Sequence, residues 1–173
     1  MKALVRTFLC IALLAGGSFA QQAAAPAAAK KPGVIEAADL KTVVPTNYFF
    51  DSLVASVQSR NSGAARFGNG KMLVAAFVDN SGYSADISRK YQGLLIVETK
   101  VSIGDAELEP GEYGFGFVAE GKFVVLNVAA DEVLHTTYQT DDTLKRPVPL
   151  KIVADGDGYR LYAGKKYVTI KAK

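Results

Sequence analysis

The sequence is poor in three residue types that often stabilise or activate an exported domain: its 173 residues include one cysteine, one histidine and no tryptophan. Cys10 lies in the apolar run at the N-terminus, so a chain cleaved after that run has no cysteine. Disulfides, thiolate catalysis and cysteine-ligated zinc are then excluded, and the apolar core must stabilise the fold. A histidine-based zinc site is not expected either, because it needs several ligands and His135 is the single histidine. We therefore expect neither a metal nor a cofactor.

An excess of charge of one sign is also missing. The chain has 20 basic and 17 acidic residues, and removal of Lys2 and Arg6 with a leader peptide leaves 18 basic against 17 acidic ones. A near-neutral surface of mixed sign gives no reason to expect nucleic acid or another polyanion as a partner.

The N-terminus has the pattern of a secretory signal. Lys2 and Arg6 precede an apolar run at residues 8–15, and Ser18-Phe19-Ala20 provides a small-x-small cleavage site. The run is shorter than the roughly 20 residues that span a bilayer. We predict a signal helix over residues 1–20, no membrane span after its cleavage, and a periplasmic, extracellular or cell-surface location. An uncleaved anchor is the alternative.

The next segment is rich in alanine and proline. Alanine favours helix, but Pro26 interrupts the run, and a helix this short is marginal in water. We predict a disordered Ala/Pro linker over residues 21–42, in which residues 33–41 form either a short helical or an extended lead-in. Residues 43–173 have the size of one ordinary domain.

Short apolar runs separated by turn signals fill the chain from Asn47 onward. Runs of this length and spacing predict a single all-β domain, an antiparallel β-sandwich or a squat barrel. At the Asn69-Gly70 turn we expect positive φ at both positions, as a two-residue hairpin demands. One helical turn is expected at residues 141–145, ended by Pro147. The predicted strands cover residues 48–50, 53–60, 65–67, 71–79, 92–102, 113–118, 123–128, 133–138, 150–154, 158–163 and 166–171.

The most strongly patterned stretch is residues 101–128. Pro110 and Gly111 predict a tight turn, in which glycine supplies the positive φ of a type II turn. A strand with an aromatic ladder on one face should follow, because large rings alternate with smaller residues. A second turn is expected at residues 119–121, before a strand at 123–128 that is apolar enough to be covered on both faces. The ladder consists of Tyr113, Phe115 and Phe117.

Part of this stretch carries a family resemblance. Residues 103–113 read Ile-Gly-Asp-Ala-Glu-Leu-Glu-Pro-Gly-Glu-Tyr. The run resembles the I-G-G-x-x-L-x-P-G-x-Y hairpin of exported bacterial β-proteins of the DUF2911 type, and departs from it at Asp105, where that pattern has glycine. The resemblance implies an exported β-protein and brings no active site with it.

Two arginines bracket a polar segment at residues 60–66. A glycine-containing turn here would offer backbone N–H groups to a carboxylate or phosphate, with guanidinium groups on both sides. The alternative is two exposed arginines paired with neighbouring acids, since such surface pairs are common and weak. The residues predicted to bind an anionic ligand are Arg60, Asn61, Ser62 and Arg66.

Candidates for catalysis or metal binding are few. The sequence has no Gly-x-Ser-x-Gly motif that would supply a serine nucleophile for His135 to activate, so we interpret this histidine as a structural residue. Asp155 and Asp157 resemble the start of a calcium loop, but further oxygen ligands do not follow, which favours a hairpin turn. Asp79 and Asp86 lie at the two ends of an oxygen-rich loop, which we interpret as a turn. If the protein were an enzyme, these two residues would be its catalytic carboxylates.

Two larger groups of side chains have structural interpretations. The glutamates around the Pro110 turn are expected to form a solvated rim rather than a glycosidase pair. The tyrosines are expected to pack across strands with their hydroxyls at an edge, rather than to bind sugar or peptide on an open face. These residues are Glu107, Glu109 and Glu112, and Tyr83, Tyr91, Tyr113, Tyr138, Tyr159, Tyr162 and Tyr167.

These patterns favour a non-catalytic domain over an enzyme. We predict an exported binding or scaffolding module, in which Arg60, Arg66 and tyrosines at strand ends contact a protein partner at a sheet edge or a small anionic ligand. Two alternatives stay open: a carboxylate-based hydrolase acting on envelope glycan or peptide, and a purely structural envelope protein. A binding module should expose an apolar patch or an unpaired strand edge. The ligand and the oligomeric state stay open.

Overall fold

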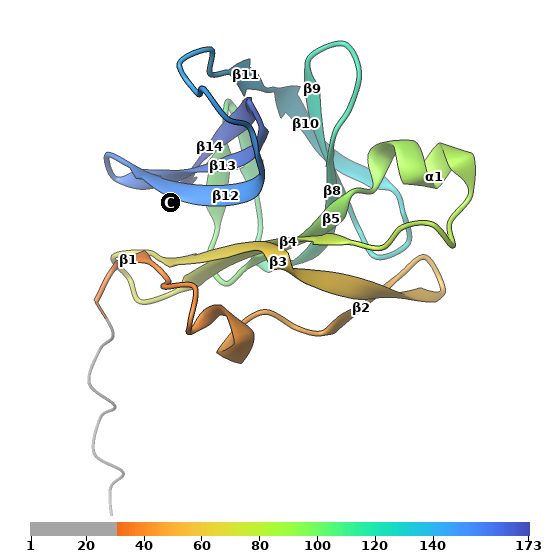
Figure 1. The fold of residues 1–173 in the computed structure, drawn as a ribbon, viewed down its shortest axis with the longest axis horizontal. Helices are drawn as coiled ribbons and strands as arrows, with labels where there is room; N and C mark the ends of the chain where they lie inside the picture. Colours follow the sequence, from red (N-terminus) through yellow and green to blue (C-terminus); the bar gives the residue numbers. More distant parts are fainter. Residues whose placement is uncertain (1–30) are drawn as a thin grey trace, which may run out of the picture.

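The computed structural model describes residues 31–173, which form two antiparallel β-sheets packed face to face (Figure 1). Each sheet has two end strands, so the predicted sandwich is confirmed and the squat-barrel alternative is wrong. The predicted signal peptide, residues 1–20, and the linker up to residue 30 lie outside the described residues. Sheet structure begins before the predicted boundary at residue 43, because β1 (Gly33–Val34) already pairs with β3 (Leu53–Arg66).

The first sheet has the strand order β1-β3-β4-β5-β8-β9-β10, and β2 pairs with the other end of β3. The second sheet has the order β12-β13-β14-β6-β7, and β11 pairs with β14. The remaining strands of the first sheet are β2 (Asn47–Phe50), β4 (Met72–Val78), β5 (Gly93–Val97), β8 (Gly111–Phe117), β9 (Lys122–Leu126) and β10 (Glu132–Thr137). Those of the second are β6 (Val101–Ile103), β7 (Ala106–Leu108), β11 (Gln139–Thr140), β12 (Val148–Asp155), β13 (Gly158–Gly164) and β14 (Lys166–Ala172).

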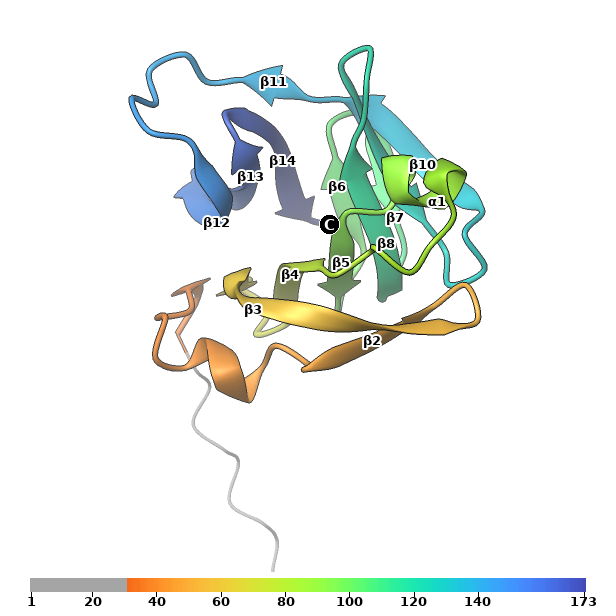
Figure 2. The same cartoon turned by 45° about the vertical axis from the view of Figure 1, so that its right-hand side comes forward.

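Apolar side chains cover both faces of the first sheet, and we call the two layers the inner core and the outer core. The inner core lies between the sheets, where Phe115 and Phe117 from β8 meet Phe123 from β9. The predicted aromatic ladder and the burial of β9 on both faces are therefore confirmed. The outer core lies on the other face, between the β2–β3 hairpin, which Figure 2 shows below the sheet, and the sheet itself. Here Phe50 stacks on Tyr91 with ring centroids 3.9 Å apart.

The glycines of β8 make room for the outer core. A Cβ atom at Gly114 would lie 2.7 Å from Cε2 of Phe50, and one at Gly116 would lie 2.1 Å from the carbonyl oxygen of Lys90. Phenylalanine and glycine alternate along β8, so aromatic rings pack on one face of the strand. On the other face, where the glycines have no side chain, neighbouring groups can approach the strand closely.

Of the two turns predicted in residues 101–128, the second forms, whereas the first is a bend at Pro110. Pro110 lies between β7 in the second sheet and β8 in the first, so the chain changes sheets there. Gly111 does not have the expected positive φ; instead it makes room for Tyr113, whose hydroxyl oxygen would lie 2.9 Å from a Cβ atom at Gly111. At the second turn Glu120 and Gly121 both have positive φ, as a type I′ hairpin turn requires.

Two further local predictions are wrong. Asn69 does not have positive φ, because the β3–β4 loop is longer than two residues and only Gly70 adopts that conformation. Residues 141–145 form no helix; the short helix is α1 (Ala85–Lys90), which Ser84 caps by accepting a hydrogen bond from the N–H of Ile87. A single 3₁₀ turn, η1 (Leu40–Thr42), precedes β2.

Candidate functional site

The segment predicted to be an anion-binding turn is the interior of a strand. Residues 60–66 belong to β3, which runs unbroken from Leu53 to Arg66 with a bulge between Val57 and Ser62. Arg60 and Arg66 therefore lie six residues apart on an extended strand, a separation of up to about 20 Å. The prediction of a turn is wrong, and binding of an anion by these residues stays a prediction.

The polar groups of that segment bond to their own neighbours. The Asn61 side chain donates to Oε1 of Gln58 over 2.7 Å, and the Ser62 hydroxyl donates to the carbonyl of Ser59 over 2.7 Å. Nη1 of Arg66 donates to the carbonyl of Gly70 over 2.8 Å, so this guanidinium group fixes the β3–β4 loop. Arg60 is exposed and has no ion pair within residues 31–173.

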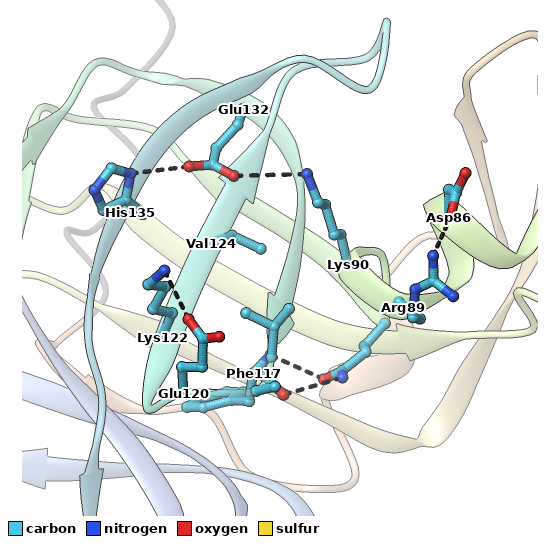
Figure 3. A pocket seen from close by; sticks show the side chains of 12 residues that line it. Asp86, Arg89, Lys90, Phe117, Glu120, Lys122, Val124, Glu132 and His135 are labelled. Atoms are coloured by element: carbon cyan, nitrogen blue, oxygen red, sulfur yellow. Dashed lines mark hydrogen bonds and ion pairs between the residues drawn. The ribbon is translucent and has the colours of Figure 1, made fainter.

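A groove of about 880 Å³ lies between α1 and the β9–β10 end of the first sheet (Figure 3). Its apolar lining includes Val118 and Val124, and its rim is charged. The Gln92 side chain closes one end by bonding both main-chain groups of Phe117, at 3.0 Å to the N–H and 3.2 Å to the carbonyl. The complete lining is Asp86, Arg89, Lys90, Gln92, Phe117, Val118, Ala119, Glu120, Lys122, Val124, Glu132 and His135.

The charges around this groove neutralise one another. Glu132 accepts from Nδ1 of His135 over 2.9 Å and lies 4.0 Å from Nζ of Lys90 (Figure 3). Lys122 pairs with Glu120 over 3.1 Å, and Arg89 pairs with Asp86. The groove therefore presents an apolar floor inside a ring of satisfied ion pairs, with no net charge left to attract an ion.

The groove has no hydroxyl or thiol nucleophile, since its lining contains no serine, threonine, cysteine or tyrosine. Its three carboxylates, Asp86, Glu120 and Glu132, are each held in an ion pair. Asp86 lines the groove, whereas Asp79 lies in a separate hollow beside Leu53 and Tyr83. Hydrogen bonding to Ser81 lowers the pKa of Asp79, the opposite of what a general acid needs. Across residues 31–173, no group of three histidines, aspartates or glutamates is placed to hold a metal ion.

The remaining sequence candidates have structural partners. Asp155 and Asp157 form the β12–β13 turn, as expected, and pair with Arg160 over 2.9 Å and Lys171 over 2.7 Å. Several tyrosine hydroxyls donate to the main chain, including Tyr113 to the carbonyl of Glu109 over 3.0 Å. The structural interpretation is confirmed for Asp155, Asp157 and Tyr113, whereas the Tyr91 hydroxyl is buried without a partner in the described residues rather than placed at an edge.

A different site lies at β2, whose outer edge is unpaired. In Figures 1 and 2, β2 is the outermost strand of the hairpin, and its one partner in the sheet is β3. The main-chain groups of Tyr48 and Phe50 face β3, because Asp51 and Ser52 form the tight turn and hydrogen-bonded pairs alternate along an antiparallel ladder. The main-chain groups of Asn47 and Phe49 therefore point away from β3. Within the described chain they have no hydrogen-bond partner.

The outward face of the hairpin is apolar. Phe49 and Val54 are direct cross-strand partners, and they are 58% and 66% exposed. The turn beside these residues is anchored by a 2.8 Å bond from the N–H of Asp51 to the carbonyl of Val128. The molecule thus holds this hairpin firmly against its outer core while leaving the far side uncovered.

A hollow of about 440 Å³ runs along the free edge of β2. Ile96 and Glu112, which are cross-strand partners on β5 and β8, also line it. Glu112 is exposed, and no lysine or arginine of residues 31–173 pairs with it. The full lining is Thr42, Val43, Val44, Pro45, Asn47, Tyr48, Phe49, Ile96 and Glu112.

The hydroxyl of Tyr48 is buried at this hollow without a hydrogen-bond partner in the described residues. Tyr48 is 5% exposed as a whole residue. Burial and the nearby Glu112 carboxylate raise the pKa of Tyr48, so its hydroxyl stays protonated. Sequence reasoning missed this site, although the run Asn47-Tyr-Phe-Phe50 with no charge and no proline is the signal that an edge strand is unprotected.

Comparisons of the chain with protein-family models, with curated proteins and with solved structures find no match. The resemblance of residues 103–113 to DUF2911-type domains therefore stays a prediction. No helix within residues 31–173 is long and apolar enough to cross a membrane.

Proposed function

We propose that this protein is an exported, non-catalytic binding domain that captures an extended polypeptide segment along the free edge of β2. A segment added to the edge would bond to the open main-chain groups of Asn47 and Phe49. Its side chains would alternate between the apolar hairpin face and the hollow beside Glu112. Binding of this kind combines main-chain hydrogen bonds for affinity with pockets for specificity.

The observation that carries the proposal is the contrast between β2 and the other strand ends of the two sheets. β10 has a bulge between Glu132 and Leu134, and β12 contains Pro149. The edge strand β7 is three residues long and carries Glu107. Bulges, prolines, charges and short length protect a sheet edge from pairing with another chain. β2 is also short, at four residues, but it has no bulge, no proline and no charge, and two of its residues are phenylalanines.

The groove beside α1 is larger but supports a binding function less well. Its charged groups already satisfy one another, so a ligand would have to break ion pairs or remain on the apolar floor. At β2, by contrast, main-chain donors and acceptors are available without breaking any contact in the described part of the molecule. A purely structural envelope protein would gain nothing from leaving them open.

The test is selection of a random dodecapeptide library, displayed on phage, against the purified protein, followed by affinity measurement of the enriched peptides. The key variant is Phe49→Pro, which removes an N–H that faces away from β3 and so leaves the β2–β3 ladder intact. We expect at least a tenfold loss of affinity, about 1.4 kcal/mol, for loss of one hydrogen bond and obstruction of the edge.

The matched control is Phe49→Thr, which also removes the ring but keeps the N–H and suits a strand. It should bind more tightly than Phe49→Pro, and both variants should unfold at temperatures close to wild type. Absence of enriched peptides, or equal binding by Phe49→Pro and wild type, would overturn the proposal. So would a wild-type dimer that Phe49→Pro converts to a monomer without any peptide binding, because the edge would then belong to a second copy.

A further inference from the structure

The hollow beside β2 has a charge that nothing in the described chain neutralises. Glu112 projects from β8 on the outer face of the first sheet, next to its cross-strand partner Ile96. The neighbouring glutamates differ, because Glu107 and Glu109 both pair with Lys100, at 3.0 and 2.9 Å. Glu107 and Glu109 are therefore paired with a cation, whereas Glu112, only three residues after Glu109, lines the hollow without one.

The rest of the hollow is suited to a long side chain with an apolar stem. Val43, Val44, Pro45 and Ile96 contribute apolar groups to its lining. The buried Tyr48 and its neighbour Phe49 complete the lining at the strand. Aromatic rings and aliphatic walls leading to a carboxylate match the shape and charge of a lysine or arginine side chain, whose methylene groups pack on apolar surface while the head meets an acid.

The hollow is also in the correct place to receive a side chain of an added strand. It is lined by Asn47 and Phe49, the two residues whose main-chain groups are open. A strand paired to that edge lies about 4.8 Å from β2, and its alternate side chains point to the same face. One of these side chains would project over Ile96 toward Glu112.

We infer that the hollow selects a lysine or arginine in the captured polypeptide, with Glu112 as its counter-ion. The inference rests on the function proposed above and specifies the partner: an extended segment with one basic side chain among apolar or small ones. Acidic segments would be rejected at the same position, because Glu112 would repel them.

The experiment compares peptide pools from one random dodecapeptide phage library, selected in parallel on wild type and on Glu112→Gln. The wild-type pool should show lysine or arginine at one position several times more often than the unselected library, and the Glu112→Gln pool should not. Asp105→Asn is the matched control, because it also removes one exposed acid, but on the β6–β7 turn of the second sheet. Its pool should keep the basic position.

A double-mutant cycle then measures the pair directly. The enriched peptide should bind two- to fivefold less tightly to Glu112→Gln, as expected for an exposed ion pair. Replacing its basic residue with glutamine should give a similar loss on wild type and almost none on Glu112→Gln. Salt should weaken only the wild-type pair.

The outcomes separate this inference from the proposed function. Peptides that require the open edge, shown by loss of binding to Phe49→Pro, but that carry no basic preference would overturn the inference and leave the proposed function standing. Equal basic frequencies in the wild-type and Glu112→Gln pools would have the same meaning. Failure of Phe49→Pro to weaken binding would overturn both.

Discussion

The two faces of the first sheet differ in how completely their buried polar groups are hydrogen-bonded. On the inner face, the second sheet covers the apolar surface, and Tyr159 donates to the carbonyl of Arg66 over 2.6 Å across the two sheets. On the outer face, the β2–β3 hairpin provides the cover, and Tyr48 is buried with its hydroxyl unbonded. Both layers contain fully buried rings, so the difference is in polar satisfaction rather than in packing.

This difference separates the part of the molecule that stabilises the fold from the part that we propose binds a partner. A buried polar group without a partner and an open strand edge both cost free energy in the isolated molecule, and natural proteins usually remove them. Here they occur together at one strand, with an exposed apolar face and an unpaired carboxylate beside them. The inner face has no such combination in the described residues, which supports assigning binding to the outer side.

The largest expected effect is on the free energy of unfolding, compared between a phenylalanine of the inner core and one on the outward face of the hairpin. Phe115 is fully buried in the inner core, and Phe49 is 58% exposed on the hairpin. Phe115→Ala should lower the free energy of unfolding by about 3–5 kcal/mol, because it removes buried contacts and leaves a cavity. Phe49→Ala should change it by less than about 0.5 kcal/mol, as a surface substitution does. Urea unfolding followed by circular dichroism measures both, and a large loss for Phe49→Ala would show that its ring supports the fold.

The next comparison concerns two of the buried tyrosines, Tyr159 on the inner side and Tyr48 on the outer side. Tyr159→Phe should destabilise by about 1–2 kcal/mol, because the hydrogen bond to Arg66 is lost and a part-buried carbonyl is left unpaired. Tyr48→Phe removes a hydroxyl that has no partner, so we expect no loss and up to about 1 kcal/mol of gain. Urea unfolding of both variants under the same conditions is the measurement. Equal losses would mean that the Tyr48 hydroxyl is bonded in solution.

Much of the inner face could be predicted from sequence, because local rules are enough there. The alternation of Phe115 and Phe117 with glycines predicts a strand with one aromatic face, and Gly121 and Gly156 supply the positive φ that tight turns need. These predictions are confirmed at β8, at the β8–β9 turn and at the β12–β13 turn. The choice between sandwich and barrel was not accessible, since closure depends on strand tilt and stagger rather than on pattern.

The outer side was harder to predict because its features depend on topology. The polar run at residues 59–62 is typical of a turn, yet it is the exposed part of β3 where the strand passes from one partner to the next. Glu112 and Tyr48 meet only because Pro110 carries the chain from the second sheet to the first. The capping serine of α1 was a usable signal, since Ser84 precedes Asp86 in the first turn.

The smallest expected effect is on the pH dependence of the melting temperature, compared between variants of the ion-paired Glu107 and the unpaired Glu112. Lys100 and Lys173 hold the pKa of Glu107 below its ordinary value of 4.5. A carboxyl with a depressed pKa in the folded state adds stability above its unfolded pKa and loses it as the pH falls through the folded value. Glu107→Gln should therefore melt slightly below wild type at pH 7, and the gap should close as the pH is lowered past 4.5 toward 3.

The matched variant is Glu112→Gln, which removes a carboxylate that has no ion pair within residues 31–173. At pH 7 it should not lower the melting temperature, because no attraction is lost. Thermal unfolding of the three proteins between pH 3 and pH 7 makes the comparison. If Glu112→Gln were destabilised at neutral pH as Glu107→Gln is, a cation of the chain itself would already neutralise Glu112. The hollow beside β2 would then have no charge left for a basic side chain of a partner.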